Sequence, residues 1–136
     1  MSETAVQQQA NNTITGVVPY LSVDGAVAAA ELYKRAFGAE ELARQPLDVQ
    51  GRTMHIHLRI HGGSVMLSDF YPEYGHEKQV AAGFILHLQV ADPDLWWRRA
   101  EEAGLAVVNP LQTMFWGDRY GQLRDAFGVM WSIGGT

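Results

Sequence analysis

The most constraining feature of this chain is an internal repeat. Residues 21–38 begin Leu-Ser-Val-Asp-Gly and end Leu-Tyr-Lys-Arg-Ala-Phe-Gly, while residues 88–104 begin Leu-Gln-Val-Ala-Asp and end Trp-Trp-Arg-Arg-Ala-Glu-Glu-Ala-Gly. Each half closes on a similar short strand, Ser-Val-Met-Leu-Ser at 64–68 and Gly-Val-Met-Trp-Ser at 128–132. A repeat of this length is a supersecondary unit copied once rather than the period of a solenoid. Two copies usually meet about a pseudo-two-fold axis, so a site at their junction draws groups from both.

The local pattern predicts the same βαβββ order in each copy. In the first unit we expect a helix over 26–37 and strands over 15–23, 40–49, 53–60 and 64–69. In the second we expect a helix over 93–103 and strands over 83–90, from 106 onward, 119–124 and 129–133. The predicted fold class is α+β, with two βαβββ repeats forming a cupped mixed sheet. A polar tail over 1–14 precedes one domain over 15–136, whose units span about 15–70 and 83–134.

Composition excludes several classes of function. The length of 136 residues fits one domain, and the net charge of −5 argues against a nucleic-acid binder, which would carry a basic stripe. The chain has no cysteine, so disulfides and thiolate chemistry are excluded. No apolar run approaches the roughly 18 residues of a membrane span, and the start lacks signal-peptide features. A cytoplasmic protein without nucleic-acid or membrane partners is the expectation.

Alternation along the strands separates an apolar face from a polar one. Apolar residues at 54, 56, 58 and 60 alternate with His55, His57 and Arg59, and the strand near 85–89 places His87 and Gln89 together on one side. If helices cover the apolar faces, the remaining faces form a cup. It would hold Tyr20, Ser22, His55, His57, Arg59, Met66, Ser68, Ile85, His87, Gln89, Met130 and Ser132. Such a mixed cavity suits a small molecule.

Other interpretations of these residues stay open. The face with His55, His57 and Arg59 could simply meet solvent on a half-exposed sheet. His87 lies in an otherwise apolar strand, where a hydrogen-bonded core histidine is common. Three imidazoles, from His55, His57 and His87, could also hold a divalent metal, although no compact ligand motif is present.

Several stretches of the chain resemble the vicinal oxygen chelate superfamily, which includes glyoxalase I, bleomycin-resistance proteins and extradiol dioxygenases. They resemble its PhnB-like branch most. The matching stretches are 18–21, 31–39, 54–55, 65–69, the Phe-Trp-Gly-Asp-Arg-Tyr-Gly run at 115–121, and 123–128, where Ala126 replaces the usual proline. The resemblance covers about residues 15–134.

The resemblance implies edge-to-edge units, a cupped sheet and a homodimer. Family enzymes hold a divalent metal through first- and last-strand positions, which fall near Val18, Ser68, Ile85 and Ser132. None of these is a strong ligand, because valine and isoleucine offer no lone pair. We therefore expect no cofactor, with a divalent metal as the alternative.

Three functions follow from this reading of the sequence. The first is a metal-free binder of a small molecule, which we expect to be an anion because Arg59 and the histidines supply donors. The second is a metal-dependent lyase, isomerase or dioxygenase with displaced histidine ligands. The third is an interaction protein whose cup is filled by its own side chains. Whether the chain is an enzyme is left open. The expected ligand-binding residues are Tyr20, His55, His57, Arg59, Ser68, His87, Gln89 and Trp116.

Overall fold

Two copies of one βαβββ unit make up the fold, in a computed structural model that describes residues 14–136. The first unit contains β1 (Tyr20–Val23), α2 (Ala26–Phe37), β2 (Glu40–Arg44), β3 (Ile56–Ile60) and β4 (Gly63–Asp69). The second contains β5 (Leu86–Gln89), α3 (Pro93–Glu102), β6 (Ala106–Thr113), β7 (Arg119–Arg124) and β8 (Met130–Gly135). A linker with the short 3₁₀ helix η1 (Pro72–Tyr74) joins them. The predicted repeat and α+β fold class are confirmed. The predicted tail over 1–14 lies almost wholly outside the described residues.

Each unit forms its own four-stranded mixed sheet. The strand orders are β1-β4-β3-β2 and β5-β8-β7-β6, with a parallel pair at β1–β4 and at β5–β8 and antiparallel pairs elsewhere. Among residues 14–136, no ladder joins the two sheets. One edge of β1 and one edge of β5 therefore have no strand partner among the described residues.

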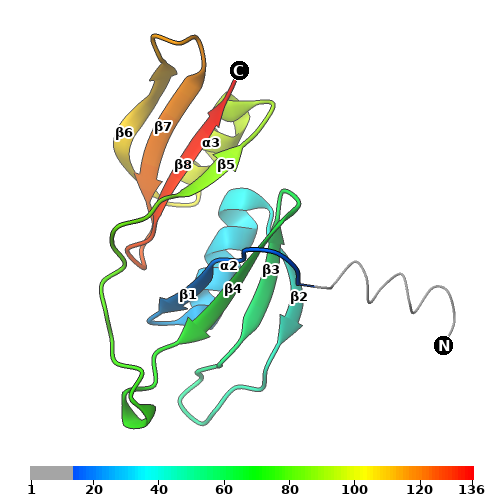
Figure 1. Cartoon of the computed structure of the whole chain (residues 1–136), viewed down its shortest axis with the longest axis vertical. Coiled ribbons are helices and arrows are strands. Elements are labelled where there is room, and N and C mark those ends of the chain that lie inside the picture. Colours follow the sequence, from blue (N-terminus) through cyan, green and yellow to red (C-terminus); the bar gives the residue numbers. More distant parts are fainter. Residues whose placement is uncertain (1–13) are drawn as a thin grey trace, which may run out of the picture.

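The units lie one above the other, with α2 behind the first sheet and α3 behind the second (Figure 1). The two helices pack against each other, and both contact strands of their own unit. Aromatic rings join the units: the Phe37 ring on α2 lies 4.5 Å from the Trp131 ring on β8. The other face of each sheet carries no helix.

The strand alternation accounts for the core. Leu21 and Val23 of β1, like Ile56 and Leu58 of β3, are buried against α2, whose alanines let the helix approach the sheet closely. In the second unit Leu123, Trp131 and Ile133 are buried in the same way. Leu58, Leu67, Leu123 and Ile133 have no exposed surface.

The helix bounds agree with the sequence prediction, but several strands are shorter than expected. The first strand begins at Tyr20 rather than residue 15, because Gly16 adopts a left-handed φ of 71° and Pro19 has no N–H for a ladder. The strand expected over 83–90 spans only 86–89, since Gly83 is also left-handed at φ 81°. β6 continues past Pro110 to Thr113 by means of register shifts.

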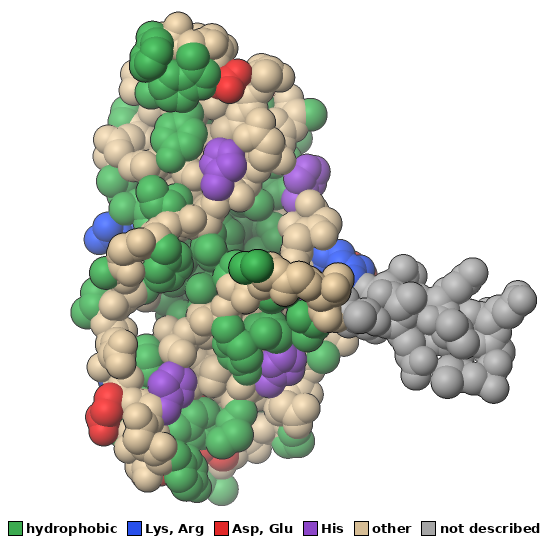
Figure 2. Space-filling model, viewed as in Figure 1, with side chains coloured by type: hydrophobic (Ala, Val, Ile, Leu, Met, Phe, Trp, Pro, Cys, Tyr) green, Lys and Arg blue, Asp and Glu red, His purple; other side chains and the backbone are tan. Residues whose placement is uncertain are grey.

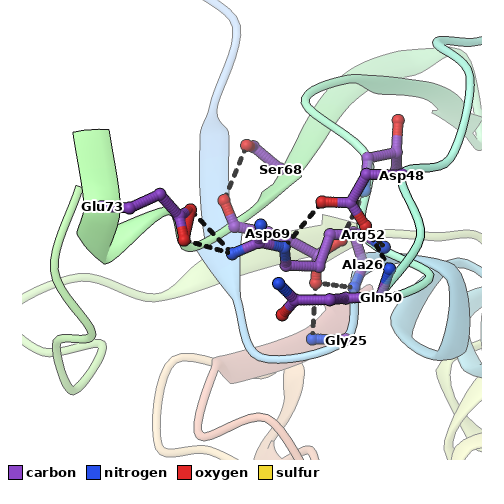
Figure 3. Close-up of polar contacts among 9 residues, drawn as sticks. Gly25, Ala26, Asp48, Gln50, Arg52, Ser68, Asp69 and Glu73 are labelled. Carbon is purple, nitrogen blue, oxygen red and sulfur yellow. Dashed lines mark hydrogen bonds and ion pairs between the residues drawn. The ribbon is translucent and has the colours of Figure 1, made fainter. Parts of the chain in front are cut away.

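A buried aspartate organises the start of α2. Asp69, at the end of β4, accepts backbone hydrogen bonds from Gly25 at 2.9 Å and Ala26 at 3.0 Å with Oδ1, and from Thr53 at 2.9 Å with Oδ2 (Figure 3). The N-cap residue of α2 is Gly25, which has no side chain that could accept a hydrogen bond. The first backbone N–H groups of the helix therefore need another acceptor, and Asp69 on β4 provides it. Nearby, Arg52 pairs with Asp48 and with Glu73 on the surface (Figure 3).

None of the helices within residues 14–136 is long and apolar enough to cross a membrane.

Candidate functional site

The candidate site is a hollow on the open face of the second sheet, which we call the second-unit pocket. Its volume is about 390 Å³. Strands β5, β7 and β8 form its floor, and the β6–β7 hairpin forms one side. Its lining residues are Ile85, His87, Gln89, Trp116, Asp118, Arg119, Tyr120, Ser132, Gly134 and Gly135.

A three-residue hydrogen-bond chain crosses the floor of this pocket. His87 and Ser132 are register partners on the parallel strands β5 and β8, and the His87 Nδ1 lies 2.6 Å from the Ser132 Oγ. The His87 Nε2 lies 2.8 Å from the Gln89 Oε1, two residues along the same strand. If the Gln89 oxygen accepts from Nε2, then Nδ1 is the nitrogen that accepts from the Ser132 hydroxyl. Both ring nitrogens are thus held, which fixes the ring in the pocket wall.

Aromatic side chains complete the wall around His87. The Tyr120 ring stacks on the His87 ring with centroids 5.9 Å apart, and its hydroxyl accepts from Gln122 at 3.2 Å. Gly134 leaves room for this stack, because a Cβ there would lie 3.0 Å from the His87 Cε1. At the hairpin tip Trp116 is 52% exposed, so its ring is available to a ligand.

The charged groups beside the pocket have hydrogen-bond partners of different kinds. Arg119 donates to Asp94 at 2.6 Å, and Asp118 accepts from the Trp116 indole at 3.2 Å. Arg119 is thus neutralised by an ion pair, whereas Asp118 keeps its negative charge because the indole is neutral.

The first-unit residues of the predicted site lie on the open face of the other sheet. The Tyr20 hydroxyl donates to the Met54 carbonyl at 2.8 Å and lies 3.1 Å from the His55 Nδ1. Arg59 is half-buried on β3, opposite Glu40 and Ser64 in the ladders. Tyr20 lines a separate hollow beside the linker.

Two predicted residues are less accessible than the sequence suggested. His57 is only 1% exposed and its Nε2 lies 2.9 Å from the Ser64 Oγ. Burial lowers the pKa of His57, and the positive charges of His55 and Arg59 lower it further. Ser68 is buried as well, and its hydroxyl donates to the Asp69 carbonyl at 2.9 Å.

Within one chain, His87, Gln89 and Trp116 therefore lie together in the second unit. Tyr20 and His55 lie together in the first unit, and the two groups do not meet. The sequence analysis missed Arg119, Tyr120 and Gly134, although the first two lie in the Trp-Gly-Asp-Arg-Tyr-Gly run that carried the family resemblance. Their place in the wall depends on the β7–β8 register, which the sequence pattern alone does not reveal.

The four positions at which the family resemblance led us to look for metal ligands do not form a ligand set. Ile85 presents an alkyl side chain to the pocket, and Val18 lies before the start of β1. The hydroxyls of Ser68 and Ser132 are hydrogen-bonded within the protein. Within the described part of the chain, no group of three histidine, aspartate or glutamate side chains could hold a metal ion, and this includes the set of His55, His57 and His87.

Comparison with known proteins establishes the family. The model of the Glyoxalase/Bleomycin resistance protein/Dioxygenase superfamily matches residues 14–133. The chain therefore belongs to this superfamily, as the sequence motifs predicted.

Several known proteins are similar to this chain in sequence or in structure. The Mycobacterium tuberculosis protein Rv0887c is 40% identical over 140 residues, which cover 96% of this chain and 82% of that protein. Among solved structures, TioX from Micromonospora sp. ML1 has a TM-score of 0.71 at 28% identity, covering 89% of this chain and 98% of TioX. A PhnB protein from Bacillus cereus shares the fold, with a TM-score of 0.67 at 19% identity over 90% of this chain and 100% of that one.

Proposed function

We propose that this chain binds a small anionic molecule in the second-unit pocket and needs no metal to do so. The observation that carries the proposal is His87, held between Ser132 and Gln89 on the floor of a concave, partly aromatic pocket. A cavity with a few convergent polar groups among apolar ones is the usual form of a small-molecule site.

The arrangement around His87 favours an anion. The His87 Nε2 engages the Gln89 Oε1, which leaves both hydrogens of the Gln89 amide group for a ligand. Arg119 lines the same pocket, and its guanidinium supplies a positive charge. A carboxylate or phosphonate group would gain both hydrogen bonds and charge at this point.

Binding without a metal follows from the chemistry of the side chains. Aliphatic groups and hydrogen-bonded serine hydroxyls are poor ligands for the divalent ions that related enzymes use. We therefore assign recognition of the ligand to His87, Gln89 and Trp116 rather than to an ion.

We also propose that the chain works as a homodimer. The predicted binding residues are divided between two open sheet faces, and the viewed surface carries histidine and hydrophobic side chains with few charges (Figure 2). A second copy would place the face with Tyr20, His55 and Arg59 over the second-unit pocket of its partner. Arg59 could then bind the same anion that His87 attracts.

The binding proposal is tested by calorimetric titration of methylphosphonate, phosphonoacetate and acetate at one fixed pH. We expect at least tenfold weaker binding for His87→Phe and for Arg59→Ala than for wild type. His61→Ala is the control, because His61 lies at the β3–β4 turn against Trp96. Equal affinity of wild type and Arg59→Ala would remove Arg59 from the site. No binding of any of these anions to wild type would reject the anion proposal.

The dimer proposal is tested by light scattering across micromolar concentrations. A dimer has twice the chain mass of 15.1 kDa and should bury roughly 2,000 Å² or more if it is obligate. A constant mass of one chain would contradict it.

A further inference from the structure

The internal repeat places one arginine at the same position on each helix. Arg35 on α2 and Arg99 on α3 lie 64 residues apart, in the matching runs Tyr-Lys-Arg-Ala and Trp-Arg-Arg-Ala. The aromatic residue two positions before each arginine is buried, and so is the alanine that follows it. The two arginines are therefore equivalent residues of the two units.

Both arginines line one hollow where the two helices meet. Helices α2 and α3 pack against each other, and a hollow of about 310 Å³ at this contact is lined by Arg35, Arg99, Glu102 and Ala103. We call it the arginine hollow. It shares no residue with the second-unit pocket, and it belongs to the helical side of the molecule, behind the sheets (Figure 1).

The two guanidinium groups have no anionic partner in the part of the chain that the structure describes. Among residues 14–136, no ion pair or hydrogen bond involves the side chain of Arg35 or Arg99. Glu102 lines the same hollow but lies beyond ion-pair distance of both arginines. Two like charges at one hollow repel each other, so an anion that neutralises both would be bound favourably.

The guanidinium of Arg99 is held in place on two sides. It lies over the Trp96 ring, 5.6 Å from the ring centroid, and a Cβ at Gly38 would lie 3.1 Å from the Arg99 Nη2. Gly38 is the C-cap of α2, so Arg99 reaches from the second unit to the end of the first-unit helix. A group that is ordered before the ligand arrives loses less conformational entropy when the ligand binds.

Stabilisation of the helix ends does not by itself explain this arrangement. A basic residue in the last turn of a helix offsets the negative end of the helix dipole, and Arg35 and Arg99 each lie in such a turn. That effect requires one arginine on each helix, but it does not require a common hollow in which the two charges repel. Their convergence instead favours a ligand that carries negative charge.

We propose that the arginine hollow binds a dianionic phosphate group. A guanidinium offers two parallel N–H groups to one anion, so two guanidinium groups match the several oxygens and the double charge of a phosphate better than the single charge of a carboxylate. The volume of the hollow lies at the lower end of the range of small-molecule sites, roughly 300–1,000 Å³. This inference does not depend on the second-unit pocket.

Calorimetric titration of inorganic phosphate and of glycerol 3-phosphate at pH 8, where both probes are mainly dianions, tests the site. We expect saturable binding to the full chain, and binding weaker by about tenfold or more for Arg35→Gln and for Arg99→Gln. Tighter binding of glycerol 3-phosphate would identify a phosphate ester as the ligand, and tighter binding of phosphate would identify the free ion. No saturable binding of either probe would overturn the proposal.

Matched variants separate this site from a general effect of charge. Arg98→Gln removes the same charge from an exposed neighbour on α3 that does not line the hollow, and it should leave the affinity unchanged. Glu102→Gln removes a negative charge from the hollow and should tighten binding about threefold. Equal weakening by Arg98→Gln and Arg99→Gln, or unchanged affinity of both Arg35→Gln and Arg99→Gln, would overturn the proposal.

One further variant distinguishes the arginine hollow from the second-unit pocket. His87→Phe changes a wall residue of that pocket and none of the arginine hollow, so phosphate should still bind to this variant. Complete loss of phosphate binding in His87→Phe would place the phosphate in the second-unit pocket and contradict the assignment to Arg35 and Arg99.

Discussion

The hydroxyl of Tyr33 on α2 donates a hydrogen bond of 2.5 Å to the Oδ2 of Asp125, which follows β7 and lies 92 residues further along the chain. The same oxygen accepts from the Trp131 indole at 2.9 Å, and the Oδ1 accepts from the amides of Phe127 and Val129. Burial and the Asp125 carboxylate raise the pKa of Tyr33, so the phenol stays protonated and remains a donor. One buried carboxylate thereby ties the helix of the first unit to the last hairpin of the second.

Removing this inter-unit hydrogen bond should destabilise the whole chain. We expect Tyr33→Phe to lower the free energy of unfolding by about 1–3 kcal/mol, because a buried carboxylate oxygen loses one of its two donors. Urea denaturation measures the change. Tyr74→Phe is the control, since that ring is 76% exposed, and it should change stability by less than about 0.5 kcal/mol. Equal effects of the two substitutions would contradict the role of Tyr33.

Asp69 should matter more for stability than an ordinary helix cap. Asp69→Ala leaves three backbone amides, those of Gly25, Ala26 and Thr53, without their acceptor, and we expect a loss of roughly 3 kcal/mol. Asp92 caps α3 through the single Leu95 amide at 3.2 Å, so Asp92→Ala should cost about 1 kcal/mol. The reverse order of the two losses in urea denaturation would contradict this account.

His57 should make stability depend on pH in the acid range. Its pKa in the folded chain lies below the ordinary value of 6.5, because burial and then the charges of His55 and Arg59 disfavour the protonated ring. The unfolded chain therefore binds the proton more tightly. The contribution of His57 to stability is complete above about pH 6.5 and is lost as the pH falls below that value.

We expect the thermal midpoint of wild type to fall more steeply between pH 7.5 and 5.5 than that of His57→Asn. His61→Asn, which changes an exposed histidine, should keep the wild-type slope. A parallel fall in wild type and His57→Asn would show that His57 does not carry the effect.

The floor of the second-unit pocket should be sensitive to a single methyl group. In Gly134→Ala the new Cβ would lie 3.0 Å from the His87 Cε1 and 3.1 Å from the Arg119 carbonyl, which forces the His87 ring out of place. We expect affinity for methylphosphonate to fall about tenfold, by calorimetry. Gly63→Ala is the matched strand control, because its Cβ would meet the Ile60 carbonyl at an ordinary 3.6 Å. Unchanged affinity in Gly134→Ala would show that binding does not depend on the position of the His87 ring.

Much of the fold could be predicted from local pattern. Flanking glycines and apolar spacing marked α2 at its observed bounds, and alternation separated the buried Ile56 and Leu58 from the polar face of β3. The burial of His57 could not be predicted in this way, because it lies on the same polar face as the more accessible His55. What covers a side chain depends on the other elements that pack near it, and alternation does not encode them.

The arrangement of the candidate residues could be predicted only in part, for the same reason. Spacing along one strand placed His87 and Gln89 on one side, and their side chains are hydrogen-bonded in the structure. The contact of Tyr120 with His87 comes from strands that meet only in the folded sheet. The division of the predicted residues between two sheets likewise became visible only in three dimensions.

The central claim is that a small anion binds beside His87, and the imidazole signals of the five histidines in an NMR spectrum test it most directly. Methylphosphonate should be titrated into the full chain while all five imidazoles are followed. We expect the His87 signals to shift in a saturable way, and those of His61 and His76, which lie outside the second-unit pocket, to stay unchanged. Shifts confined to His61 or His76, or no saturable shift of His87, would contradict it.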